Sequence, residues 1–121
     1  MTQETVVWPL EIRLNKDKNA LTVRFEDGKD FTYTAEFLRV MSPSAEVQGH
    51  SPDQRQTVPG KRKVLVRNLE QIGNYAVKIV FDDGHSTGLF SWTYLYELGQ
   101  DYEPRWSAYL SELEAKGLGR D

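Results

Sequence analysis

Apolar and polar residues alternate along three short stretches near the start of the chain. The apolar positions are Leu10, Ile12 and Leu14, then Leu21, Val23 and Phe25, then Phe31 and Tyr33. Successive side chains of a strand point to opposite faces, so this period of two predicts three half-buried strands. Residues 15–19 separate the first two stretches, and Asp27-Gly28 lies between the second and third. Because glycine tolerates the positive φ of a tight hairpin, an antiparallel meander is predicted.

The second half of the chain contains two further strand signals and another turn. Residues 64–66 predict a short edge strand, and residues 75–81, which are apolar on both faces, predict a longer and central one. The Asp-Asp-Gly sequence at residues 82–84 predicts a turn, after which residues 86–90 return along the sheet.

Two short helices are predicted from capping residues. Thr34 caps residues 35–40, and this helix stops at Ser42-Pro43. Ser91 caps residues 92–98, and Gly99 is expected to end that helix.

A third helix is predicted from Pro104 to Gly117, because apolar residues recur there at intervals of three and four. These are Trp106, Tyr109, Leu110 and Leu113. Such spacing places them on one face of a helix. This amphipathic helix packs either on its own sheet or on a partner, and the pattern leaves both open.

The two hairpins share a pattern at an offset of 56 residues. Leu21, Val23, Phe25, Asp27 and Gly28 correspond to Val77, Ile79, Phe81, Asp83 and Gly84. Each copy continues into a predicted short helix. The pattern indicates either a strand–turn–strand–helix unit used twice or the independent recurrence of a common Asp-Gly hairpin.

Together these elements predict an α+β fold in a single domain. It comprises a twisted, mainly antiparallel sheet of about five or six strands, two short helices and a C-terminal amphipathic helix. A chain of 121 residues has the length of one domain with one hydrophobic core. The fold is expected to unfold as one cooperative unit.

Composition excludes several classes of function. The net charge of −3 and the isoelectric point near 5.4 argue against nucleic-acid binding, because phosphate backbones require surplus Lys and Arg. Without cysteine, the chain has no disulfide and no thiolate ligand for a metal. Apolar runs are far shorter than the roughly 20 residues that cross a bilayer, and no export signal is recognisable, so a cytoplasmic protein without membrane contact is predicted.

Four segments resemble the gamma-butyrobetaine hydroxylase-like N-terminal domain family, a domain of unknown function. They are WPLEI from Trp8, LTVRFEDG from Leu21, LRVMSPSAEVQGH from Leu38, and residues 75–99 with FDDGHSTGLFSWTYLYELG. The resemblance implies a domain over residues 8–99, followed by a helical extension over residues 100–121. In the hydroxylases this module precedes a jelly-roll catalytic domain. It is also found alone in bacteria and fused to iron–sulfur carrier ATPases.

The family binds zinc through a C-P-C-x-x-C motif and a histidine from a later hairpin. Here the cysteine positions hold Ser42, Ser44 and Val47, and the histidine corresponds to His85. Serine is a poor neutral ligand for Zn²⁺ and valine is none, so zinc binding at this site is not implied by the resemblance. We therefore expect stability that is indifferent to chelators, with Val47 at least partly buried near His85.

Residues 42–63 contain no apolar periodicity and predict a long loop. Long loops in compact domains are often functional. One hypothesis is a recognition loop that contacts an acidic partner or a phosphate through His50, Arg55, Lys61, Arg62 and Lys63. The other is a flexible excursion in place of the lost zinc motif.

A metal site built from His50, Asp83 and His85 is the alternative to a recognition loop. Two histidines and a carboxylate can bind iron, but the usual His-x-Asp spacing is absent around His50. A histidine directly after Asp83-Gly84 is more typical of a turn residue that is hydrogen-bonded within its loop.

The sequence predicts a small non-enzymatic interaction or adaptor module with a protein partner. No catalytic constellation or cofactor motif is present, and none of the iron and 2-oxoglutarate ligands of the hydroxylases can be carried over. The fusions within the family suggest a role in iron–sulfur or cofactor handling. The alternative is a metal-binding accessory protein.

Overall fold

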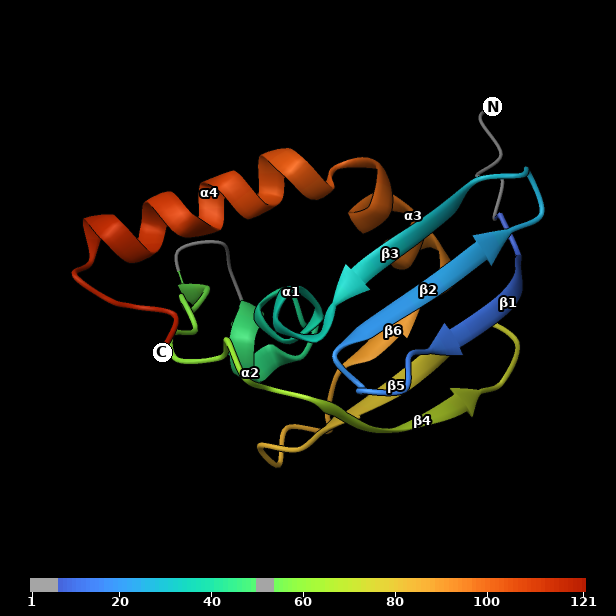
Figure 1. Ribbon diagram of the computed structural model, residues 1–121, viewed down its shortest axis with the longest axis horizontal. Coiled ribbons are helices and arrows are strands. Elements are labelled where there is room, and N and C mark those ends of the chain that lie inside the picture. The colour runs from blue at the N-terminus through green and yellow to red at the C-terminus, as the bar shows by residue number, and fades with distance from the viewer. Residues whose placement is uncertain (1–6, 50–53) are drawn as a thin grey trace.

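Two antiparallel three-stranded sheets form the framework of the protein (Figure 1). The computed structural model describes residues 7–49 and 54–121. The strands are β1 (Pro9–Leu14), β2 (Ala20–Phe25), β3 (Asp30–Thr34), β4 (Val66–Ile72), β5 (Ala76–Phe81) and β6 (Leu89–Ser91). The helices are α1 (Ala35–Val40), α2 (Ala45–Gln48), α3 (Trp92–Gln100) and α4 (Tyr102–Ala115). The predicted α+β class and antiparallel pairing are confirmed.

The strands divide between two sheets rather than joining in one. β2 lies between β1 and β3, and β5 lies between β4 and β6, as predicted for a central strand. A backbone hydrogen bond of 2.8 Å from Val66 N–H to the Lys18 carbonyl links the start of β4 to the β1–β2 turn. Alternation in a sequence locates strands but does not determine which strand pairs with which, so the division was not predictable from it.

Both sheets contribute to one hydrophobic core. On β2 the apolar side chains predicted to face inward, Leu21, Val23 and Phe25, are fully buried. Thr22 lies on the opposite face, where its hydroxyl is 2.9 Å from that of Thr32 on β3. Buried residues from both sheets, α1, α3 and α4 form a single cluster.

Several elements in the middle of the chain differ from the sequence-based prediction. The edge strand expected at residues 64–66 begins at Val66 and continues to Ile72, because its exposed polar residues pair with β5 through the backbone. The strand expected at residues 86–90 is confined to Leu89–Ser91. A four-residue helix, α2, interrupts the predicted loop, since the Ser44 side chain accepts the Glu46 N–H and caps it.

The two hairpins have the same turn. The equivalent residues are Phe25, Asp27, Gly28 and Lys29 in the first hairpin and Phe81, Asp83, Gly84 and His85 in the second. In each, the phenylalanine N–H donates to the carbonyl of the residue after the glycine, at 2.8 and 2.9 Å. The aspartate Oδ1 accepts the N–H of that same residue at 3.0 Å. The glycines have φ of 89° and 92°, a region that favours glycine.

A β-bulge also recurs at the equivalent place. The register between β1 and β2 shifts opposite Phe25 and Arg24, and the register between β4 and β5 shifts opposite Phe81 and Val80. Since an isolated Asp-Gly hairpin would not reproduce a bulge in the preceding strand, the structure favours a repeated βββα unit.

Each unit reaches across to the turn of the other. Arg39 of α1 donates from Nε to Oδ2 of Asp83 at 2.8 Å. Tyr96 of α3 donates its hydroxyl to Oδ2 of Asp27 at 2.5 Å. Arg39 and Tyr96 hold equivalent positions, because each lies five residues after the capping residue of its helix. The two units are therefore interlocked reciprocally.

The capping residues of the short helices are confirmed, but Gly99 does not end α3. Thr34 caps α1 and Ser91 caps α3, each accepting a backbone N–H. Helix α3 continues through Gly99 to Gln100. A Cβ at position 99 would lie 2.3 Å from the ring of Phe31. Glycine is thus required there by close packing and not by a helix end.

Helix α4 packs on its own chain. It begins at Tyr102, two residues before the predicted Pro104, and Tyr109 and Leu113 join the core, whereas Leu110 is exposed. Beyond the helix, Arg120 forms two hydrogen bonds of 2.9 and 2.7 Å with the carboxylate of the buried residue Glu36. No helix in the described part of the chain is long and apolar enough to span a membrane.

Candidate functional site

The segment after α1 meets the second hairpin through a buried hydrogen bond. Ser42 Oγ lies 2.8 Å from His85 Nε2, and both residues are buried, with Ser42 fully enclosed. The resemblance implied that these two segments meet, and the contact confirms it. Gly88 permits this approach, since a Cβ there would lie 2.4 Å from the Ser42 hydroxyl oxygen.

The other ring nitrogen of His85 is also occupied. Nδ1 lies 3.0 Å from Oε2 of Glu46 on α2. Burial, together with the nearby charge of Arg39, lowers the pKa of His85 below its usual value of 6.5. A neutral ring carries one proton, and a carboxylate can only accept, so the proton resides on Nδ1 and Ser42 donates to Nε2. The Ser42 oxygen in turn accepts the Ser44 N–H at 3.3 Å.

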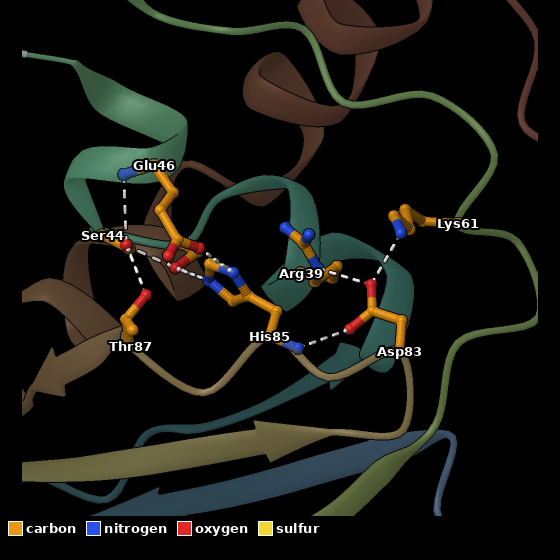
Figure 2. A network of polar contacts seen from close by, with 8 residues as sticks. Arg39, Ser44, Glu46, Lys61, Asp83, His85 and Thr87 are labelled. Carbon is orange, nitrogen blue, oxygen red and sulfur yellow. Dashed lines mark hydrogen bonds and ion pairs between the residues drawn. The ribbon is translucent and has the colours of Figure 1, made fainter.

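The other two positions that correspond to the family's ligands, Ser44 and Val47, lie in the same centre. Ser44 Oγ lies 2.7 Å from Thr87 Oγ1 and accepts the Glu46 N–H at 3.2 Å (Figure 2). The Val47 side chain is 2% exposed, as expected for a residue that replaces a ligand with apolar packing. We call Ser42, Ser44, Glu46, Val47 and His85 the serine–histidine centre.

Next to this centre, Asp83 accepts hydrogen bonds from two cations (Figure 2). Arg39 Nε lies 2.8 Å and Lys61 Nζ 2.7 Å from its Oδ2. Burial alone would raise the pKa of Asp83, but hydrogen bonds from Lys61, the His85 amide and Arg39 lower it to about 2. The carboxylate therefore stays ionised and fixes the hairpin against α1.

The order of groups in the serine–histidine centre is that of a hydrolytic triad: hydroxyl, imidazole, carboxylate. A nucleophile must reach its substrate, and the Ser42 side chain is fully buried. In this arrangement the hydroxyl serves to satisfy the ring nitrogen of His85. We conclude that these contacts stabilise the fold.

The residues of the predicted recognition loop contact different elements. Arg55 pairs with Glu112 on α4, and Lys61 pairs with Asp83. Arg62 pairs with Asp121 at 2.9 Å, and Lys63 is exposed. His50 lies outside the described residues. The recognition loop therefore stays a prediction.

The predicted metal site remains a prediction, since His50 lies outside the described residues. His85 and Asp83 are engaged with Glu46 and Ser42, and with Arg39 and Lys61, respectively. Within residues 7–49 and 54–121, no three His, Asp or Glu side chains are grouped as metal ligands would be.

A cleft of about 400 Å³ lies between the segment after α1 and helices α3 and α4. Its walls include Met41, Pro43, Tyr94 and Ala108, and Arg55 and Arg105 contribute two guanidinium groups. Tyr94 donates its hydroxyl to the Met41 carbonyl at 2.5 Å. We call this the arginine cleft. The sequence did not predict this cleft, because its residues are spread from position 41 to 112. The main feature of the sequence that could have indicated it is the cation Arg105 next to the apolar residue Trp106.

The fold and the site define a class: a small α+β module of two interlocked units with a hydrogen-bonded serine–histidine centre between them. Residues 12–96 match the family described as gamma-butyrobetaine hydroxylase-like, N-terminal. The chain therefore belongs to this family. No curated protein matches the chain.

Solved structures extend the similarity beyond the matched residues. One protein, with an NMR solution structure, is 45% identical over 97% of this chain and 92% of its own, with a TM-score of 0.83. A second NMR structure is 40% identical over 99% and 89%, with a TM-score of 0.84. A crystal structure from Acidithiobacillus ferrooxidans, of unknown function and from the DUF971 family, is 40% identical over 75% and 91%, with a TM-score of 0.63.

Proposed function

We propose that this protein is a non-enzymatic adaptor that binds an acidic segment of a partner protein in the arginine cleft. The observation that carries the proposal is the state of Arg105. Among the described residues, the nearest carboxylate oxygen to Arg105 is Oδ2 of Asp101, which lies 3.9 Å from Nε, beyond hydrogen-bond distance. Within this part of the chain the guanidinium therefore has no carboxylate hydrogen-bonded to it, which supports a role in binding a carboxylate from outside.

The walls of the cleft suit a peptide better than a bare anion. The Arg105 guanidinium lies 6.0 Å from the centre of the Tyr94 ring, and Met41, Pro43 and Ala108 add apolar surface. Burial raises the pKa of the Tyr94 hydroxyl, so it remains neutral. Apolar anchors around a few charged groups are typical of protein-binding sites.

The second cation, Arg55, belongs to the predicted recognition loop. It is paired with Glu112, which also accepts from Thr57. An acidic partner would compete with Glu112 for Arg55 while binding Arg105 directly. Participation in iron–sulfur or cofactor handling is the further part of this proposal, and it is supported by the family resemblance alone.

The test is quantitative affinity purification with wild-type protein and with the Arg105→Glu variant. Arg24→Glu is the matched control, since Arg24 is an exposed cation on β2, outside the cleft. Recovery of a common partner by wild type and Arg24→Glu, with loss of at least tenfold for Arg105→Glu (roughly 1.4 kcal/mol of binding free energy), supports the proposal. Equal recovery by all three proteins overturns it.

A further inference from the structure

One backbone edge of strand β1 has no partner strand among residues 7–49 and 54–121. It is the terminal strand of its sheet and pairs only with β2 among the described strands. Asn15 N–H donates to the Ala20 carbonyl at 3.0 Å. Because bonded and non-bonded pairs alternate along an antiparallel ladder, the N–H and C=O groups of Ile12 point away from β2. In the described part of the chain no strand pairs with these groups, so they are a candidate site for pairing with another strand.

The same edge exposes large apolar side chains. Leu10 is 63% exposed and Trp8 is 45% exposed. Beside them runs a groove of about 320 Å³ whose lining includes Ile12, Val77 and Trp92. Edge strands are usually protected from pairing, so an open apolar edge indicates an interaction surface.

The charges on β1 select one antiparallel pairing of this strand with a second copy of itself. If the pairing is centred on Ile12, then Glu11 of each copy lies opposite Arg13 of the other. Centring the pairing on Glu11 or on Arg13 instead would place like charges opposite each other. Opposite charges across a strand pair stabilise it, and like charges destabilise it.

The equivalent edge of the other sheet lacks this property. Strand β4 pairs with β5 alone among the described strands. Pairing β4 with itself about Leu69 would set Asn68 opposite Glu70 and Arg67 opposite Gln71. No opposite charges meet in that arrangement, so the complementarity is specific to β1.

We propose that two copies of this protein associate through antiparallel pairing of their β1 strands, centred on Ile12. The β1-β2-β3 sheets of the two copies then form one continuous sheet, in the order β3-β2-β1-β1-β2-β3. The Ile12 backbone groups of each copy bond to those of the other, and two Glu11–Arg13 pairs flank the centre. The contact is isologous, which closes the assembly at a dimer.

Sedimentation of the full chain over a concentration series reaching about 1 mM tests the proposal. The wild type is expected to form a dimer that weakens with added salt. Glu11→Arg and Arg13→Glu each convert both pairs into repulsions, so each variant alone should dissociate roughly tenfold more readily or worse. Far-ultraviolet circular dichroism checks that both remain folded.

Mixing the two variants supplies the decisive comparison. The Glu11→Arg variant carries arginine at positions 11 and 13, and the Arg13→Glu variant carries glutamate at both of these positions. Opposite charges again meet across the contact, so a heterodimer should form with near wild-type affinity. The double variant Glu11→Arg/Arg13→Glu should likewise restore the homodimer. A wild type that stays monomeric throughout overturns the proposal, and so does a dimer that neither single variant weakens.

Discussion

The hydroxyl oxygen of Ser42 lies 2.8 Å from Nε2 of His85, with both residues buried. In zinc-binding members of the family, as the resemblance implies, a cysteine sulfur and the histidine would share a metal ion at this place. Here the ring nitrogen accepts a hydrogen bond from the serine hydroxyl instead. The positions that correspond to the family's ligands hold hydrogen-bonded serines and a buried valine.

Restoring the cysteines should restore metal binding. We expect Ser42→Cys/Ser44→Cys/Val47→Cys to bind one Zn²⁺ with His85, because three thiolates and an imidazole match a structural zinc site. Competition with a chromogenic chelator measures the affinity. The same variant with His85→Ala is the control and should bind more weakly. The melting temperature of the wild type should not change with EDTA, and a fall would contradict the metal-free assignment.

The lowered pKa of His85 should make stability depend on pH. In the unfolded chain the ring binds a proton near pH 6.5, but burial opposes protonation in the folded state. The unfolded state then binds more protons, so the free energy of unfolding should fall as the pH drops below about 6.5. Urea titrations across this range measure it. The His85→Gln variant should lack this slope. An identical slope in both proteins would mean that a group other than His85 causes the pH dependence.

Val47→Asp should destabilise the protein strongly. The side chain is 2% exposed, so the substitution buries a carboxylate without a partner. We expect a loss of about 3 kcal/mol or more in the free energy of unfolding. Val47→Ala is the matched control and should cost about 1–2 kcal/mol through lost apolar burial. A silent Val47→Asp would mean that this segment opens at little cost.

Gly99→Ala should be destabilising although the site is helical. Alanine normally stabilises a helix by about 1 kcal/mol relative to glycine. At position 99, however, its Cβ would lie 2.3 Å from the Phe31 ring. A double-mutant cycle with Phe31→Ala measures the coupling by thermal unfolding. Removal of the ring should relieve the penalty, and a lack of coupling would refute steric overlap as its cause.

Arg120→Ala should leave a buried carboxylate without its partner. Glu36 has a side chain that is 6% exposed, and both of its oxygens accept from Arg120. We expect a loss of about 1–3 kcal/mol, measured by urea unfolding. Glu36→Gln in the same background should recover part of the loss, because an amide is cheaper to bury than a charge. No recovery would point to lost packing of Arg120 on Trp106 instead.

Local features of the fold were predictable from sequence where the cause lies within a few residues. The Asp-Gly turns and the Thr34 and Ser91 caps need only short-range hydrogen bonds, and they occur where predicted. The prediction that Gly99 ends a helix was wrong, because the role of this glycine depends on Phe31, which is far away in sequence. The division into two sheets likewise depends on long-range pairing, which alternation does not encode.

The candidate site, too, was only partly predictable from the sequence. The contact between the Ser42 segment and His85 was implied by the family motif, and burial of Val47 followed from the loss of a ligand. The arginine cleft was not predicted. Its residues come from four separate segments, and their approach depends on how α4 folds back over the chain.

The reciprocal contacts Arg39–Asp83 and Tyr96–Asp27 give each unit the role of a partner subunit for the other. A lone βββα unit could complete such contacts only by binding a second copy of itself. In a symmetric pair of that kind the two turns would be identical. Within one chain they differ, with Lys29 after one glycine and His85 after the other, so the histidine centre belongs to one half alone.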